Sequence, residues 1–174
     1  MTSQGISASR ALNPLGWLVA PMVLCVIATV LLAAPIRILG QALPQPVFPL
    51  ALAFAWPLIR PSLVPPFALL VMGLFLDLFW GGPPGLWPLC LLAAYAGVLA
   101  LRRLITGNDF VFVWAWYAAA TLVAFGVGFL AMAMRSGVAP NLLAVGWQYV
   151  WTAALFPFAD RLIRRFEDAD VRFR

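Results

Sequence analysis

The chain has 174 residues, of which 64% are hydrophobic and only 10% are charged, and its mean hydropathy is +0.98. Soluble domains are about 45–50% apolar and about 25% charged, so this composition excludes an ordinary water-soluble domain and predicts that much of the surface faces lipid. The net charge of +5 comes from arginine alone, and the arginines stand at the ends of apolar runs, which is typical of membrane anchors and not of a nucleic-acid-binding face.

The apolar runs predict one all-α membrane domain with six transmembrane helices, since a helical span needs about 20 apolar residues. A polar segment, 1–14, is expected to precede this domain, 15–158, and a charged tail, 159–174, to follow it. Both flanking segments are expected to be cytoplasmic. The predicted spans are 15–34, 47–59, 67–80, 86–101, 110–134 and 141–158.

The second predicted span is the shortest, and its 13 residues would cover only about 20 Å as a helix. Prolines crowd this region: Pro44, Pro46, Pro49, Pro57, Pro61, Pro65 and Pro66. Such density predicts a short or broken helix that other helices shield from lipid, or a re-entrant segment; a longer span that recruits Ile38–Leu43 is a further alternative.

The charged tail continues the apolar pattern of a helix. Leu162, Ile163, Phe166 and Phe173 fall on one helical face. This spacing predicts a helix lying in the membrane interface, or a continuation of the sixth span into the cytoplasm.

The distribution of arginines predicts how the chain is oriented. With six spans and a cytoplasmic N-terminus, two arginines, Arg37 and Arg135, lie outside and nine lie inside, and such an excess marks the cytoplasmic side. The chain is therefore expected to be a multi-pass protein of the bacterial cytoplasmic (inner) membrane, with both termini cytoplasmic. The nine inside residues are Arg10, Arg60, Arg102, Arg103, Arg161, Arg164, Arg165, Arg172 and Arg174.

Asp77 is the one acidic residue inside a predicted span, four residues before the Gly-Gly-Pro-Pro-Gly turn at 81–85. A charge at the bilayer centre costs about 2.5–3.5 kcal/mol on insertion scales, so Asp77 is expected to face the bundle interior and to be paired or protonated. Arg37, Arg135, a backbone amide and a polar residue of a partner chain are the candidate partners. The favoured role is helix packing or partner binding; the alternatives are a tolerated carboxylate that reaches toward the interface and an ion or proton relay.

Recognisable catalysis is not expected. Histidine is absent, the predicted spans hold a single acid, and Cys25 and Cys90 lie in apolar runs without metal-ligand spacing. We therefore predict no enzyme, no metal and no cofactor. Gln148 and Thr152 share a face of the sixth span and are expected to hydrogen-bond within or between helices.

The segment 71–89 resembles the rod shape-determining protein MreD family. That family shows a Gly-Leu-x-x-Asp-Leu helix, a glycine-rich turn, and then Gly-Leu and an apolar helix closed by basic residues. The matching residues are Gly73, Asp77, Leu78, Gly81, Gly85 and Leu86, with Arg102 and Arg103 at the basic close. The motif covers about 30 residues, and Pro83 and Pro84 depart from the usual pattern.

The resemblance implies a non-enzymatic subunit of the bacterial cell-elongation complex. Such a subunit binds the bitopic scaffold MreC and is linked through it to MreB filaments and to the RodA glycosyltransferase with its transpeptidase, and hence to peptidoglycan synthesis and cell shape. It also implies a fold similar to the substrate-binding (S) component of energy-coupling-factor transporters, and a vitamin-binding component of such a transporter is the alternative function. Membrane lipids are the other expected partners. The partner-binding or structural candidates are Gly73, Asp77, Gly81, Gly85, Arg102 and Arg103.

Overall fold

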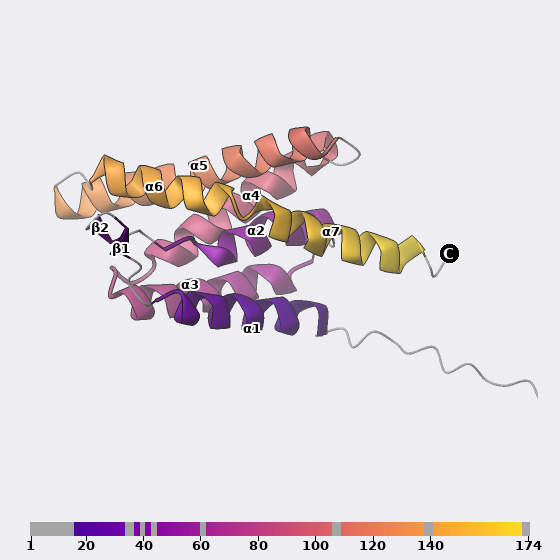
Figure 1. Ribbon diagram of the computed structural model, residues 1–174, viewed down its shortest axis with the longest axis horizontal. Coiled ribbons are helices and arrows are strands. Elements are labelled where there is room, and N and C mark those ends of the chain that lie inside the picture. Colours follow the sequence, from indigo (N-terminus) through magenta and orange to yellow (C-terminus); the bar gives the residue numbers. More distant parts are fainter. Residues whose placement is uncertain are drawn as a thin grey trace, which may run out of the picture.

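The computed structural model describes residues 16–33, 37–38, 41–42, 45–59, 62–105, 109–137 and 141–171 (Figure 1). Segment 1–14 and residues 172–174 of the tail lie outside this part of the chain. Two short strands, β1 (Arg37–Ile38) and β2 (Gln41–Ala42), form an antiparallel pair. The helices are α1 (Gly16–Leu31), α2 (Phe48–Ile59), α3 (Val64–Trp80), α4 (Leu86–Ile105), α5 (Phe110–Ser136), α6 (Leu142–Ala153) and α7 (Phe156–Val171).

The expected all-helical architecture is confirmed for the part of the chain that the structure describes, and its longest helices are consistent with a membrane protein. Three helical stretches are long and apolar enough to cross a membrane: Leu86–Ile105, Phe110–Ser136 and Leu142–Arg164, the last running from α6 into α7. Leu18–Leu31, Phe48–Ile59 and Val64–Trp80 are also apolar but shorter. That these three shorter helices cross as well remains a prediction.

The short helix α2 lies inside the bundle. It contacts α1, α3, α4, α5 and α7, and every residue from Pro49 to Pro57 is buried. Pro49 stands in its first turn, where the missing N–H removes no helical hydrogen bond, and Pro57 stands in its last turn. The expectation of a short helix that its neighbours shield from lipid is confirmed.

The bundle has two ends, which we name by their connections. At the α3–α4 end, α3 and α5 finish and α4 and α6 begin; at the α4–α5 end, α4 finishes and α5 begins. The β1–β2 pair lies at the α3–α4 end, beside the start of α6 (Figure 1).

The sixth predicted span is interrupted. Ala154 and Leu155 separate α6 from α7, because Pro157 offers no N–H to the carbonyl of Ala153 and its ring crowds that carbonyl. Two side chains of α5 hydrogen-bond to the carbonyls at the break. The Tyr117 hydroxyl donates to Thr152 O at 2.9 Å, and the Trp114 indole donates to Ala153 O at 3.3 Å.

The charged tail begins within the bundle. Phe156, Ala159 and Ile163 of α7 are buried, and α7 contacts α2. Arg164, by contrast, is exposed and pairs with Asp160 at 2.8 Å. The first part of the tail thus packs on the bundle as a helix that follows α6 after the break, and its position relative to a membrane interface remains a prediction.

Candidate functional site: the α3–α4 hairpin

Asp77 joins the end of α3 to the start of α4. Its side chain is 4% exposed, and both carboxyl oxygens accept backbone hydrogen bonds: Oδ2 from the N–H of Gly85 at 2.6 Å and Oδ1 from the N–H of Trp87 at 3.0 Å. The first N–H groups of a helix have no partner within the helix and carry partial positive charge. Asp77 therefore caps α4 from the preceding helix, and of the partners left open, the backbone amide is the one the structure shows.

The main chain of Asp77 also ends α3. Its carbonyl accepts hydrogen bonds from the N–H groups of Gly81 and Gly82. This geometry requires Gly81 in the left-handed conformation, with φ of 64° and ψ of 28°, and Gly85 also has a positive φ of 90°. Only glycine adopts such angles without steric cost, so both glycines are needed by the turn itself.

Gly73 allows α3 and α4 to approach closely. A Cβ atom built at Gly73 would lie 2.4 Å from the backbone nitrogen of Pro88 and 2.6 Å from its Cα. Because the obstructing atoms are main-chain atoms, no side-chain rotation relieves such a contact. Gly73 stands one helical turn before Asp77, so this close approach brings the carboxylate to the first turn of α4.

Aromatic rings close the sides of the hairpin. Trp80 of α3 and Trp87 of α4 meet edge to face, with ring centroids 5.0 Å apart. Trp87 in turn meets Phe125 of α5 at 6.2 Å, and the Trp80 indole donates to the side-chain carbonyl of Gln45 at 3.1 Å. The hairpin is thus tied to α5 and to the segment that leads into α2.

A polar network connects this segment to α6. Gln148 Nε2 donates to the carbonyl of Gln45 at 3.0 Å, and the Thr152 hydroxyl accepts the N–H of Val47 at 3.1 Å while donating to Gln148 O at 2.7 Å. The expected hydrogen bonding of Gln148 and Thr152 is confirmed. It serves backbone groups at the N-terminus of the buried α2, which have no water to bind.

The six candidate residues separate into two places. Gly73, Asp77, Gly81 and Gly85 come together in the hairpin, whereas Arg102 and Arg103 lie in the last turn of α4, at the opposite end of that helix. Arg103 is exposed and Arg102 is half-buried. Positively charged side chains in the last turn interact favourably with the negative end of the helix dipole. This role at the end of α4 is distinct from that of the hairpin.

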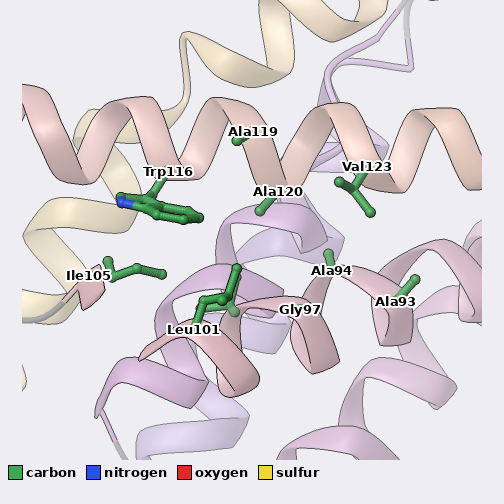
Figure 2. A pocket seen from close by; sticks show the side chains of 10 residues that line it. Ala93, Ala94, Gly97, Leu101, Ile105, Trp116, Ala119, Ala120 and Val123 are labelled. Atoms are coloured by element: carbon green, nitrogen blue, oxygen red, sulfur yellow. The ribbon is translucent and has the colours of Figure 1, made fainter. Parts of the chain in front are cut away.

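Hollows on the part of the chain that the structure describes bear on the ligand-binding alternative, and two of them stand out. A groove of about 90 Å³ lies between α4 and α5 (Figure 2). The other, of about 200 Å³, adjoins the hairpin and is lined by Pro83, Leu89, Met132 and Arg135 among others. Small-molecule sites are typically about 300–1,000 Å³ with several convergent polar groups, so neither hollow has the size of a vitamin site.

Several residues of the hairpin were not singled out in the sequence. Pro88 fixes how near α3 comes, and Gln45 links α3, α6 and α2. The sequence does hold a spacing signal for Pro88, which stands 15 residues after Gly73 across one tight turn, but Gln45 carries no pattern of its own.

No protein-family model matches the chain, no curated protein matches it, and no solved structure matches it.

Proposed function

We propose that the chain is a non-catalytic membrane subunit of the bacterial cell-elongation complex, similar to the MreD family, which binds MreC and helps to organise peptidoglycan synthesis. One observation carries the proposal: four of the residues that match the family pattern, Gly73, Asp77, Gly81 and Gly85, form a single hairpin. Each of them fixes backbone geometry. A motif used in this way suits a subunit that presents a rigid surface to a partner.

The same observation weighs against the relay considered for Asp77. A relay in a membrane normally joins several ionisable groups in series, whereas both oxygens of Asp77 accept backbone N–H groups of α4. The vitamin-transporter alternative gains no support from the hollows described above.

The full topology is part of this proposal. We infer that α1, α2 and α3 cross the membrane together with the three longer helical stretches, giving six crossings, cytoplasmic termini and an arrangement similar to the S component of energy-coupling-factor transporters. The excess of nine arginines over two supports this orientation. Reporter fusions after residues 33, 61, 83, 107 and 139 are expected to alternate between periplasmic and cytoplasmic activity, beginning periplasmic.

The direct test is recovery of MreC with the tagged chain from detergent-solubilised membranes. Asp77→Leu is expected to lower MreC recovered per folded chain at least several-fold, because both caps of α4 are lost and the hairpin surface changes. Asp109→Asn is the matched control, since Asp109 is an exposed acid whose side chain makes no capping bond. Wild-type recovery by Asp77→Leu would contradict the role given to the hairpin.

The cellular test is the shape of cells depleted of the protein. Loss of rod shape is expected, with rescue by the wild-type chain and by Asp109→Asn but not by Asp77→Leu. Rods that persist after depletion, together with tight vitamin binding by the purified chain, would favour the transporter alternative instead.

A further inference from the structure

The hollow of about 200 Å³ beside the hairpin, which we call the Arg135 hollow, has one charged side chain in its lining. The turn and the start of α4 contribute Pro83, Pro84 and Leu86, and the end of α5 contributes Met132 and Arg135. Pro84 and Arg135 are exposed, so the hollow opens to the outside of the bundle. Its other walls are apolar, so the guanidinium of Arg135 is the group that can select an occupant by charge.

The backbone donors beside this hollow are already used. The N–H groups of Gly85 and Trp87 donate to Asp77. The N–H of Leu86 donates to the carbonyl of Pro83 at 3.2 Å, and the residue after Trp87 is a proline, which has no N–H. The start of α4 therefore offers an anion no further donor, and the binding of an anion here depends on Arg135.

Arg135 has no counter-charge at its own end of the bundle. It was a candidate partner for Asp77, but that carboxylate binds the amides of α4. Among the residues that the structure describes, Arg135 forms no ion pair. The remaining acids belong to the start of α5 at the opposite end, and to α7, which runs away from the β1–β2 pair (Figure 1). They are Asp109, Asp160, Glu167, Asp168 and Asp170.

The shape of the hollow favours a carboxylate as the occupant. Guanidinium binds carboxylate through two parallel hydrogen bonds. The carboxylate of Asp or Glu ends its side chain, so it enters with a single connection to the rest of its protein. A phospholipid phosphate is a diester with a substituent on each side, and both substituents would have to leave a space of about 200 Å³.

The sequence also limits which protein supplies this carboxylate. A second copy of the chain in the same membrane orientation brings the same end to the same depth, where Asp77 is the one acid and is already bound. The carboxylate therefore belongs to a different protein.

From this combination we propose that the Arg135 hollow receives an Asp or Glu side chain of a partner membrane protein. The hollow is continuous with the hairpin, because Pro83, Pro84 and Gly85 of the turn line it. Asp77 fixes this turn and so fixes the wall that faces Arg135. The inference rests on the proposed function, since it takes the partner to be the protein held at the hairpin, and it adds the chemical group that is recognised there.

The first test measures the recovery of MreC with the tagged full chain from detergent-solubilised membranes. Arg135→Glu brings two negative groups together and is expected to lower recovery about tenfold or more, whereas Arg135→Lys keeps the charge, loses the paired hydrogen bonds and lowers recovery less. Arg103→Glu is the matched control, because Arg103 is also an exposed arginine in the last turn of a helix. It carries the same change of charge and the same loss at a helix dipole, and wild-type recovery is expected.

The outcomes separate this inference from the proposed function. Wild-type recovery by Arg135→Glu, or the same loss in Arg135→Glu and Arg103→Glu, overturns the inference and leaves the proposed function in place. Absence of MreC from the wild-type preparation contradicts the proposed function, and the inference falls with it.

The second test exchanges the charges. Each Asp and Glu that flanks the outer end of the MreC membrane span is replaced singly by Arg and is expressed together with Arg135→Glu. One of these substitutions is expected to restore most of the lost recovery, and to restore none of it in Asp77→Leu, where the hairpin itself is altered. Restoration by none of them, or equal restoration of Arg135→Glu and Asp77→Leu, overturns the ion pair.

The third test keeps Arg135 in place. A photoreactive residue at Leu89, which is exposed and lines the hollow, is expected to cross-link to MreC in membranes. The same residue at Leu122, exposed on α5 and outside the lining, is the control and is expected to label lipid. Cross-links from position 89 to lipid alone, or to a second copy of this chain, overturn the proposal.

Discussion

Asp77 supports two helices with three acceptor atoms. Its main-chain carbonyl accepts hydrogen bonds from the N–H groups just after α3. Its two carboxyl oxygens accept hydrogen bonds from the N–H groups at the start of α4. The sequence before α4 has no Ser, Thr, Asp or Asn at the usual capping position, where Gly85 stands instead. The carboxylate of α3 takes the place of this missing cap, which gives a physical reason for an acid at this depth in an apolar helix.

Asp77→Asn is expected to lower the free energy of unfolding in detergent by about 1–3 kcal/mol. The amide keeps one acceptor oxygen, so one of the two N–H groups, on Gly85 or Trp87, loses its partner in a buried site. Denaturant titration followed by tryptophan fluorescence measures the change. Asp109→Asn should shift the midpoint little, and a midpoint shift of the same size in both variants would mean that capping is not the reason.

Gly73→Ala is expected to cost about 1–3 kcal/mol by overpacking, because the added methyl meets the backbone of Pro88. The substitution should also weaken the hydrogen-bonded structure at the start of α4, since separation of the two helices moves the Asp77 carboxylate away from its N–H donors. Amide hydrogen exchange of the segment after Gly85 reports this. Gly82→Ala, at a position with open space and no positive φ, is the control; equal exchange in the two variants would contradict this account.

At the scale of elements, the break between α6 and α7 is stabilised from α5. The carbonyl of Ala153 has lost its helical donor to Pro157, and Trp114 supplies another. The Tyr117 hydroxyl also donates a hydrogen bond to the neighbouring carbonyl of Thr152. The break between α6 and α7 is thus held by two side chains of α5.

This arrangement predicts an energetic coupling between Trp114 and Pro157. Trp114→Phe should destabilise the wild-type chain by about 0.5–1.5 kcal/mol and should cost less in the Pro157→Ala background, where an N–H is restored to Ala153. A double-mutant cycle of unfolding free energies in detergent measures the difference. Additive effects would show that the indole bond does not replace the one proline removes.

The predictability of these elements follows from local chemistry. Glycines and prolines at 81–85 marked the turn, and the apolar run before Trp80 marked α3, so those boundaries agree with the structure to within a few residues. The break at Ala154 was missed because a single proline in an apolar run also occurs inside continuous membrane helices. The partners of Asp77 were left open because a contact across a turn depends on how closely two helices approach, which Gly73 decides.

At the scale of the whole molecule, α2 is the centre and five helices enclose it. Proline density and shortness predicted this shielding, because a helix of 12 residues covers only about 18 Å and leaves its end groups without partners. The residues that meet those end groups, Thr152 and Gln148, lie about 100 positions away in the chain. Periodicity carries no information on such distant pairs.

A lipid-soluble photoreactive probe tests the enclosure of α2. Label is expected on exposed residues of α5 such as Leu122 and Leu130 and is expected to be absent from Leu50, Leu52 and Phe54, which are at most 2% exposed. Peptide mapping by mass spectrometry reads the pattern. Comparable labelling of α2 and α5 would show that lipid reaches the centre of the bundle.

The enclosure of α2 has a consequence for biosynthesis. The ribosome releases α2 before α4, α5 and α7, the helices that later surround it. Until Thr152 emerges, the amide of Val47 lacks its acceptor, so the nascent chain holds an incompletely bonded proline-rich segment for more than 100 residues of elongation. The enclosure of α2 is therefore completed only after the residues of α6 and α7 have been synthesised.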